Sequence, residues 1–370
     1  MDVRPFLNLM VEKKASDLFI TAGFPPSAKI DGELRQLSED KLTPEQSLVF
    51  VESLMSDVQK KEFHDTSECN FAFAAKDLGR FRVSAFWQRE SAGCVMRRIE
   101  TQIPDVDDLK LPAILKDLVM SKRGLIIMVG GTGTGKSTSL AALVGYRNAH
   151  ARGHILTIED PVEFVHNHRK SIITQREVGI DTESFDAALK SSLRQAPDVI
   201  LIGEIRTQET MEFALSFAET GHLCMATLHA NNANQALDRI MHLVPESKHN
   251  QLLFDLSLNL RGIVAQQLIP KSDGTGRRAA IEVLINTPRV ASLIAKNELH
   301  LLKETMGKSR EQGMQTFDQA LLDLYIEGEI SYADALHHAD SPNDLRLMIK
   351  LQSNEAASSG TMDGITLDMD

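Results

Sequence analysis

The chain has 370 residues, of which 42% are hydrophobic and 25% charged, and its formal net charge is −11. This length exceeds one ordinary hydrophobic core, so we expect two folded units. The acidic balance argues against a duplex-DNA binder, whose affinity depends on lysines and arginines that neutralise phosphates, and we expect no nucleic acid among the partners.

Cysteine usage and hydropathy indicate the compartment. Cys69, Cys94 and Cys224 form no close pair in the sequence, which disfavours a disulfide framework and indicates a reducing environment. The first residues lack the long apolar run of a signal peptide, and no stretch approaches the ~20 apolar residues of a membrane-spanning helix. We therefore expect a cytoplasmic protein without direct membrane insertion, which reaches a membrane only through a partner.

The first hundred residues combine helical and strand patterns. Residues 3–15 have helical spacing, and 16–23 have the composition of a strand. Asp31-Gly32 is a hairpin turn signal. After a helical stretch that begins near Pro44, apolar and polar residues alternate around Asp77–Gly79, which predicts a second hairpin.

From residue 113 onward, apolar runs alternate with helical segments. Apolar runs without alternation indicate strands that are buried on both faces of a parallel sheet. The runs are "GLIIMV" (124–129), "HILTIE" (154–159), "DVILIG" (198–203) and "LCMATLH" (223–229). Beyond residue 245 we expect mostly helix, with one strand at 279–285.

These patterns predict the domain organisation. An N-terminal α+β domain covers 1–100, a Pro- and Asp-rich linker covers 101–112, and an α/β domain with a helical C-terminal part covers 113–352. Residues 353–370 contain four acidic groups, no basic ones and few large apolar side chains, and we expect a disordered tail there.

The stretch "GLIIMVGGTGTGKST" contains a phosphate-binding loop. It matches G-x-x-x-x-G-K-[ST] directly after a buried strand and before a predicted helix, the context that this motif requires. Main-chain N–H groups and the helix N-terminus attract the phosphates, Lys136 reaches the β/γ oxygens and the Ser137 hydroxyl binds Mg²⁺. The residues expected at the nucleotide are Gly130, Gly131, Thr132, Gly133, Thr134, Gly135, Lys136, Ser137 and Thr138.

Polar groups also follow the other three predicted strands. In an open α/β sheet, ligands gather at the carboxyl ends of the strands. One residue of the trio Glu159, Asp160 and Glu163 is a candidate for orienting the attacking water, although such a cluster can equally cap the next element. Glu204 stands where phosphate-loop enzymes place a carboxylate that organises Mg²⁺, and His229 ends the fourth strand.

Two histidines and a cysteine within "GHLCMATLHANNA" raise the possibility of a metal site. On a strand, Cys224 and His229 point to opposite faces, and His222 and His229 lie roughly 20 Å apart. A structural zinc site needs four converging ligands, so these residues do not form one. His229 is expected to hydrogen-bond the γ-phosphate or a catalytic carboxylate, whereas a structural or intersubunit role is expected for His222.

Four motifs in order resemble the Walker A, Asp box, Walker B and His box of the secretion and pilus ATPases. They read "GGTGTGKS", "ILTIEDPVEF", "LRQAPDVILIGEIR" and "TGHLCMATLHANNA". The flanking sequence "ASDLFITAGFPPSAKIDGELRQL" is similar to the N-terminal domain of the type IV pilus retraction ATPases, the PilT/PilU family. The segment "TPRVASLIAKNE" and the residues after it most resemble the PilU branch of that family.

The resemblance implies a homohexameric ring with ATP bound between subunits. Each subunit would join an N-terminal PAS-like domain to a RecA-like P-loop ATPase domain with a helical C-terminal region. It implies Glu163 as the general base, Glu204 as the Walker B carboxylate and Mg²⁺ organiser, and His222 and His229 as the His-box pair.

The family also places arginines near the nucleotide. The candidate arginine fingers here are Arg80, Arg82, Arg97 and Arg98 in the N-terminal domain, and Arg194 and Arg206 around the Walker B strand. A solvated strand edge explains Arg80 and Arg82 equally well. We keep both interpretations open.

The function implied is that of an ATP-hydrolysing motor that drives or assists type IV pilus retraction. Its expected cofactors are ATP and Mg²⁺. Its expected partners are further copies of itself, a PilT-like paralogous ATPase and the inner-membrane platform protein of the pilus, which would hold the chain at the inner membrane.

One alternative is an accessory ATP-binding ring protein that supports a PilT-type motor. Another is a pilus assembly or type II secretion ATPase, although three scattered cysteines cannot build the tetracysteine zinc module that many of those carry.

Overall fold

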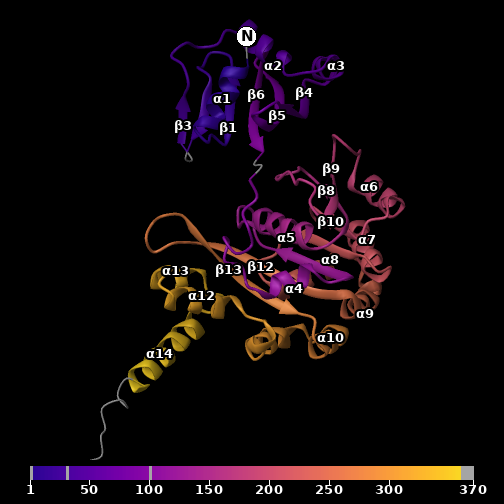
Figure 1. Ribbon diagram of the computed structural model, residues 1–370, viewed down its shortest axis with the longest axis vertical. Coiled ribbons are helices and arrows are strands. Elements are labelled where there is room, and N and C mark those ends of the chain that lie inside the picture. The colour runs from indigo at the N-terminus through magenta and orange to yellow at the C-terminus, as the bar shows by residue number, and fades with distance from the viewer. Residues whose placement is uncertain (1–2, 31–32, 100–101, 360–370) are drawn as a thin grey trace, which may run out of the picture. The chain divides into compact units, whose positions relative to one another are not determined.

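The structure is a computed structural model that describes residues 3–30, 33–99 and 102–359 (Figure 1). The chain divides into two compact units. The first comprises Met1–Ile103 and Val162–His166, and the second comprises Pro104–Pro161 and Asn167–Asp370. The short segment 162–166 therefore belongs to the first unit although it lies within the sequence of the second.

The first unit contains an antiparallel sheet with helices on one face. Among the described residues its strands pair in the order β3-β2-β1-β6-β5-β4 (Figure 1). The strands are β1 (Asp17–Thr21), β2 (Ser27–Ile30), β3 (Glu33–Gln36), β4 (Glu68–Ala75), β5 (Gly79–Gln88) and β6 (Ser91–Ile99). The helices are α1 (Arg4–Glu12), α2 (Pro44–Ser53) and α3 (Asp57–Thr66).

Alternation along the strands builds the core of this unit. Leu18 and Ile20 of β1 are buried on the same face as Met96 of β6, and this face packs against Phe50 of α2 and Phe63 of α3. The helices begin where their sequences favour capping, because Thr43 and Ser56 each form a capping box with a glutamine three residues later.

The turns before and after β5 differ in whether the sequence predicts them. The predicted hairpin of β4 and β5 is present, and its turn places Asp77 and Gly79 at φ of 69° and 107°. The hairpin of β5 and β6 turns through Arg89 and Glu90, both at positive φ, without the Asn-Gly or Asp-Gly signal typical of such turns. The Asp31-Gly32 turn lies outside the described residues, although β2 and β3 on either side of it pair as expected.

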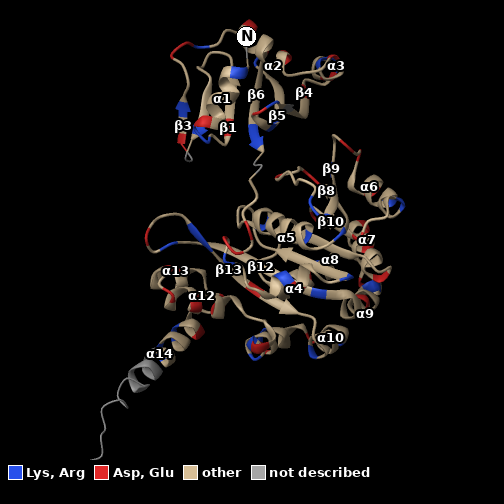
Figure 2. Cartoon of the chain, in the orientation of Figure 1, with Lys and Arg blue, Asp and Glu red and all other residues tan. Residues whose placement is uncertain are grey.

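The second unit contains a mixed sheet whose strands pair, among the described residues, in the order β13-β12-β7-β11-β10-β8-β9 (Figure 1). The β12–β13 pair is antiparallel and all the others are parallel. The strands are β7 (Gly124–Val129), β8 (Gly153–Glu159), β9 (Ser171–Glu177), β10 (Val199–Ile202), β11 (Leu223–Leu228), β12 (Leu260–Pro270) and β13 (Arg277–Ile285). The central strands β7, β11 and β10 carry no charged residue and are drawn in tan throughout in Figure 2.

Helices cover both faces of this sheet. On one face, Leu140 and Val144 of α5 pack with Leu115 of α4 over Ile126 and Met128 of β7. On the other face, side chains of α6 to α9 and of the C-terminal helices pack over the alternate strand residues. The helices are α4 (Ile114–Val119), α5 (Lys136–His150), α6 (Phe185–Ser192), α7 (Gln208–Glu219), α8 (Ala233–His242), α9 (His249–Asn259), α10 (Pro288–Ala295), α11 (Leu302–Gly307), α12 (Phe317–Ile326), α13 (Tyr332–His338) and α14 (Pro342–Ser359).

Three findings differ from the sequence-based expectations. Strand β12 lies in the region expected to be helical, and β9 was not predicted. Strand β12 begins directly after α9, with no glycine, proline or other turn residue between them, so the sequence does not mark the end of the helix. Its pairing with β7 has a register shift between Leu260 and Gly262. The third is the tail expected from residue 353, where α14 continues through Ser359. The remainder of the tail lies outside the described residues.

Candidate nucleotide site

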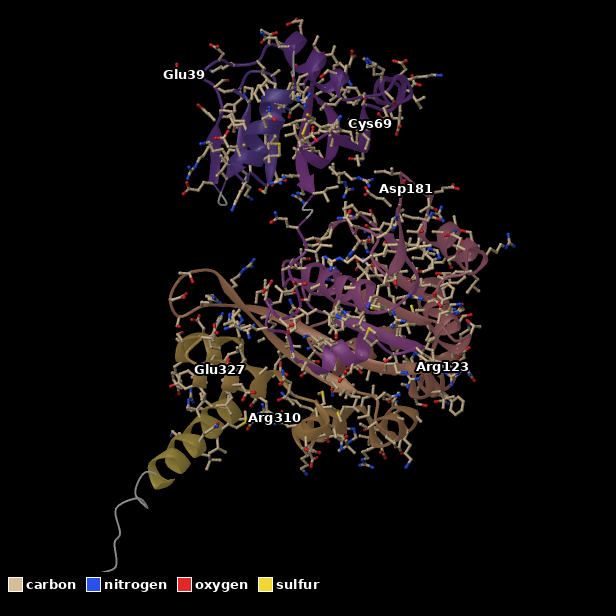
Figure 3. All side chains as sticks on the ribbon, viewed as in Figure 1. Glu39, Cys69, Arg123, Asp181, Arg310 and Glu327 are labelled. Atoms are coloured by element: carbon tan, nitrogen blue, oxygen red, sulfur yellow. The ribbon has the colours of Figure 1, made fainter. Side chains whose placement is uncertain are left out.

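Four neighbouring parallel strands bring the predicted motifs to one edge of the sheet. Strands β7, β11, β10 and β8 are adjacent in that order (Figure 1). The phosphate loop follows β7, His229 follows β11, Glu204 follows β10 after one residue, and Glu159 ends β8. Figure 3 labels Arg123, which directly precedes β7 at the opposite edge, and Asp181, which follows β9.

The phosphate loop is held by bonds to its own carbonyl oxygens. Lys136 Nζ donates to the Gly130 and Gly131 oxygens, each at 2.7 Å, and Thr134 Oγ1 donates to the Gly131 oxygen at 2.9 Å. Gly130 and Gly135 have φ of 156° and 82°, a region that side chains disfavour. Helix α5 then begins at Lys136, so its unpaired N-terminal N–H groups face the loop.

Glu204 lies between two cationic or potentially cationic side chains. Its Oε2 accepts a hydrogen bond from Arg206 Nε at 2.7 Å and lies 2.6 Å from Arg206 Nη2, and its Oε1 lies 3.3 Å from His229 Nε2. The hydrogen bond to Glu204 raises the pKa of Arg206. Glu204 is 16% exposed and Arg206 is 60% exposed, so the carboxylate is sheltered while the guanidinium reaches solvent. The pair therefore presents an acidic group that is already oriented at the strand end.

Two of the three acidic residues at the end of β8, Glu159 and Glu163, have different surroundings. Glu159 Oε1 accepts hydrogen bonds from Thr157 Oγ1 at 2.6 Å and from Gln175 Nε2 at 3.2 Å, which ties it to β8 and β9. A Cβ on Gly203 would lie 3.0 Å from the Glu159 Cα, so β10 and β8 approach closely here because residue 203 is glycine. Glu163 is exposed and belongs to the first unit.

The structure does not bring His222 to the phosphate edge of its own chain. It directly precedes β11, at the opposite end of the strand from His229. Its Nδ1 lies 3.1 Å from Thr220 Oγ1 and 3.3 Å from the Phe217 carbonyl oxygen, and its ring packs edge-on against Phe217. These contacts close the turn between α7 and β11, and the structural or intersubunit role expected for His222 stays a prediction.

The six candidate arginines occupy different surroundings. Arg97 Nε donates to Asp17 Oδ1 at 2.8 Å, and Arg82 lies opposite Arg97 across β5 and β6. Arg80 lies on the same face of β5 as Arg82, and Arg98 lies on the other face of β6. Arg194 is exposed in a single 3₁₀ turn, and Arg206 pairs with Glu204 as described above.

Comparison with known proteins identifies the family. The sequence matches the family described as Type II/IV secretion system protein over residues 2–336. The chain belongs to this family.

Relatives within the family extend over the whole chain. It is 60% identical to "Type IV pilus ATPase PilU" of Pseudomonas aeruginosa, covering 100% of this chain and 97% of that protein. It is 39% identical to "Type IV pilus retractation ATPase PilT" of the same organism, covering 93% and 100%. The crystal structure of the pilus retraction motor PilT with bound ADP superposes with a TM-score of 0.88 at 39% identity, covering 94% and 99%.

These similarities confirm the predicted family resemblance, the α/β ATPase fold and the ATPase activity. The chain is thus an ATPase that binds nucleotide. Among the described residues, no helix has both the length and the apolar character needed to cross a bilayer.

Sequence reasoning missed one residue at this site, Gln266 of β12. Its Nε2 donates to the Thr134 carbonyl oxygen at 2.8 Å, and it is 1% exposed. The run "GIVAQQLIP" has the β-branched residues of a strand, and recognising it would have placed a polar side chain next to the phosphate loop.

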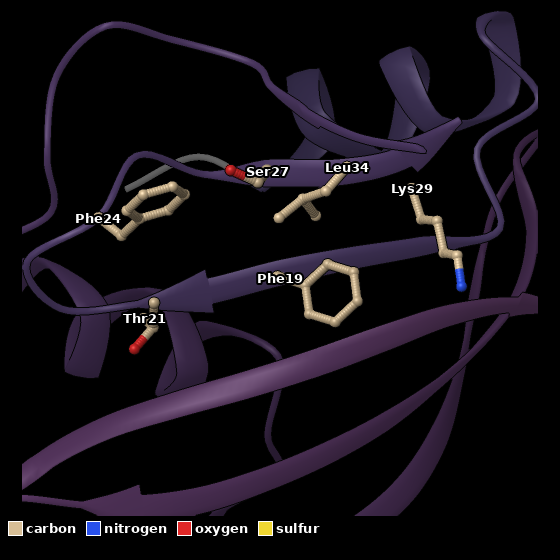
Figure 4. Close-up of a pocket in the computed structure, with 6 residues that line it drawn as sticks. All are labelled: Phe19, Thr21, Phe24, Ser27, Lys29 and Leu34. Atoms are coloured by element: carbon tan, nitrogen blue, oxygen red, sulfur yellow. The ribbon is translucent and has the colours of Figure 1, made fainter. Parts of the chain in front are cut away.

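A pocket of about 410 Å³ lies elsewhere, on the face of the first unit's sheet opposite its helices (Figure 4). Phe19, Phe24 and Leu34 form its apolar lining, and Thr21, Ser27 and Lys29 add polar groups. Phe24 and Leu34 are 39% and 59% exposed, so the pocket is open to solvent, and none of the predicted site residues lines it.

Proposed function

We propose that this ATPase is a motor subunit that drives or assists retraction of type IV pili. The observation that carries the proposal is the 60% identity to a type IV pilus ATPase along the whole chain, together with the four motifs at one sheet edge. Three relatives named "Type II secretion system protein E" match 42% to 72% of this chain, and this chain covers 29% to 54% of their length. That difference favours a pilus role over a secretion role.

In the proposed mechanism each strand end has a separate task. Lys136 and the N–H groups of the loop hold the phosphates, and Glu163 accepts the proton of the attacking water. His229 Nε2 lies 3.3 Å from Glu204 Oε1, and in this proposal its imidazole would sense the γ-phosphate from the end of β11.

Mg²⁺ fits the donors present at this edge. The Ser137 hydroxyl is in the first turn of α5, and Glu204 is a sheltered carboxylate at a neighbouring strand end. These two oxygen donors would hold the ion, which neutralises phosphate charge when it is bound. The Arg206 guanidinium neutralises the same carboxylate in this structure.

We further propose a homohexamer that works with a PilT-like paralogue and with the inner-membrane platform protein of the pilus. Mass photometry at micromolar concentration, with and without ATP, tests the assembly. We expect hexamers at least with nucleotide, and a strict monomer in the absence of any paralogue would contradict the ring.

The function itself is tested by measuring pilus retraction in cells that lack every related ATPase. We expect the wild-type chain, alone or together with a PilT-type protein, to restore retraction. Lys136→Ala should abolish ATP turnover and the restored retraction. Retraction that persists with Lys136→Ala would exclude a motor driven by this site.

The same variant separates the motor from an accessory role. One observation favours the accessory: the relative at 60% is named only as a type IV pilus ATPase, whereas the relative named for retraction is 39% identical. An accessory ring would support a PilT-type motor equally well with wild-type or Lys136→Ala protein, because its contribution would not depend on turnover.

A further inference from the structure

We propose that Gln266 is a positioning residue for the nucleotide phosphates. Its hydrogen bond to the Thr134 carbonyl fixes the orientation of the phosphate loop. The proposal rests on the ATPase activity of the chain and does not depend on a role in pili. Gln266 lies on β12, which pairs with β7, the strand that leads into the loop. It therefore reaches the loop from a strand that carries none of the four sequence motifs.

The hydrogen bond of Gln266 fixes one peptide unit of the loop. Gln266 Nε2 donates to the Thr134 oxygen at 2.8 Å, and in a trans peptide the C=O and the next N–H point in opposite directions. Holding the Thr134 oxygen toward β12 thus turns the Gly135 N–H away from β12. The carbonyls of Gly130 and Gly131 are held in the same way by Lys136. Three carbonyls are bonded to side chains, which favours presenting N–H groups to the phosphates.

Gln266 lies close to the glycines at both ends of the loop. A Cβ on Gly130 would lie 2.6 Å from Thr134 Oγ1 and 2.7 Å from the Gln266 main-chain oxygen, and a Cβ on Gly135 would lie 2.8 Å from Gln266 Nε2. A side chain at either position would therefore force these atoms to shift. The loop is therefore seated directly on this residue, and a change at Gln266 acts on the loop without an intermediate.

The amide oxygen of Gln266 indicates that its N–H donor, and not its packing, is the property that the phosphate loop requires. Gln266 Oε1 is buried and has no hydrogen-bond partner within the described part of the chain. A buried acceptor without a partner destabilises the fold, and an unbranched apolar side chain would avoid that cost. Removing the amide should then weaken nucleotide binding without weakening the fold, a combination that a purely structural residue does not produce.

Three variants in the full-length protein separate these effects. Gln266→Met keeps the unbranched shape and removes the donor, and Gln266→Leu removes the donor with a different shape, so the result does not depend on one variant folding. Gln266→Glu keeps the shape but, at about pH 9 where a buried carboxyl is ionised, replaces the donor with a second acceptor, which repels the Thr134 oxygen. Gln267→Met is the matched control, since Gln267 is the next residue on β12 and points to the other face.

The measurements are ADP affinity by fluorescence titration, ATP turnover and the melting temperature. We expect Gln266→Met and Gln266→Leu to raise the Kd for ADP and the KM for ATP about 3- to 10-fold, the effect of one hydrogen bond. We expect kcat within about twofold of wild type and an unchanged or raised melting temperature, because the catalytic groups lie on other strands.

The ranking of the variants by ADP affinity separates the proposed role from a role in packing. Gln266→Glu should weaken binding more than Gln266→Met, by about tenfold or more relative to wild type, and Gln267→Met should bind ADP like the wild type. A role in packing alone predicts the reverse order, with the isosteric glutamate closest to wild type. That order, or wild-type ADP affinity in folded Gln266→Met and Gln266→Leu, would overturn the proposal.

Discussion

His229 Nε2 lies 3.3 Å from Glu204 Oε1, so the ends of the neighbouring strands β11 and β10 are joined by a contact between side chains. A second contact reinforces this junction, because the Ile205 N–H donates to the Thr227 oxygen at 2.9 Å. Glu204 therefore occupies a fixed position at the end of β10, with β11 between it and the strand that leads into the phosphate loop, and a change in its charge acts on both His229 and Arg206.

Glu204→Gln should separate ATP binding from ATP hydrolysis. The amide keeps the size of the side chain but removes the charge that faces Arg206 and that would help to hold Mg²⁺. We expect turnover to fall by about 10²-fold or more, with ADP affinity within a fewfold of wild type because Lys136 and the loop are untouched. Glu209→Gln, at an exposed position in the first turn of α7, is the control for loss of one carboxylate. Turnover of Glu204→Gln equal to that of the control would remove Glu204 from the site.

Glu163→Gln tests the proposed general base. Glu163 is exposed in the segment Val162–His166, which belongs to the first unit. We expect this variant to bind ATP with an affinity close to wild type and to lose about 10²–10⁴ in turnover, the contribution of a positioned base. Single-turnover measurements with pre-bound ATP isolate the chemical step. Wild-type turnover of this variant would exclude Glu163 as the base. Glu159 is a weaker candidate than Glu163 because its carboxylate already accepts hydrogen bonds from Thr157 and Gln175.

The motifs of this site were predictable because their strands are continuous apolar runs. β7 and β11 are buried along almost their whole length, and such runs followed by polar residues mark strand ends directly. β9 is a seven-residue edge strand of mixed burial, and β12 continues from α9 without a breaker, so the β-branched residues of β12 were not separated from the preceding helix by a turn signal. Gln266 was hidden by the second of these difficulties, because its importance depends on which strand lies beside β7.

Arg97 has a structural partner, and that partner predicts the effect of removing it. Asp17 is only 9% exposed at its side chain, and Arg97, 71% exposed, covers it. We expect Arg97→Ala to lower the free energy of unfolding of the first unit by about 1 kcal/mol, the upper range for a pair open to solvent. Arg97→Lys should recover part of the loss. Arg98→Ala, on the other face of β6, should change stability by less than about 0.5 kcal/mol. Equal stability of Arg97→Ala and wild type in urea denaturation would contradict a structural role.

Glu282 joins the N-termini of two helices, and its burial makes the stability of the second unit dependent on pH. Its Oε1 accepts the N–H of Ala233, the first residue of α8, at 2.8 Å, and its Oε2 accepts that of Phe317, the first residue of α12, at 3.4 Å. The side chain is 1% exposed, and burial raises its pKa to about 7, an effect that these two N–H bonds only partly offset. Asp340 raises the pKa further and Lys303 lowers it.

Because the native pKa of Glu282 exceeds its unfolded value, the native state binds the proton more tightly. The resulting stabilisation is complete below the unfolded pKa of about 4.5 and is lost as pH rises through about 7. Glu282→Gln resembles the protonated form at every pH. The free energy of unfolding of the wild type, relative to Glu282→Gln, should therefore fall by up to about 3 kcal/mol between pH 5 and pH 8. Urea denaturation at four pH values measures this difference. A difference that stays constant over that range would mean that the two helix N-termini keep Glu282 ionised throughout, and that the contact between α8 and α12 does not respond to pH.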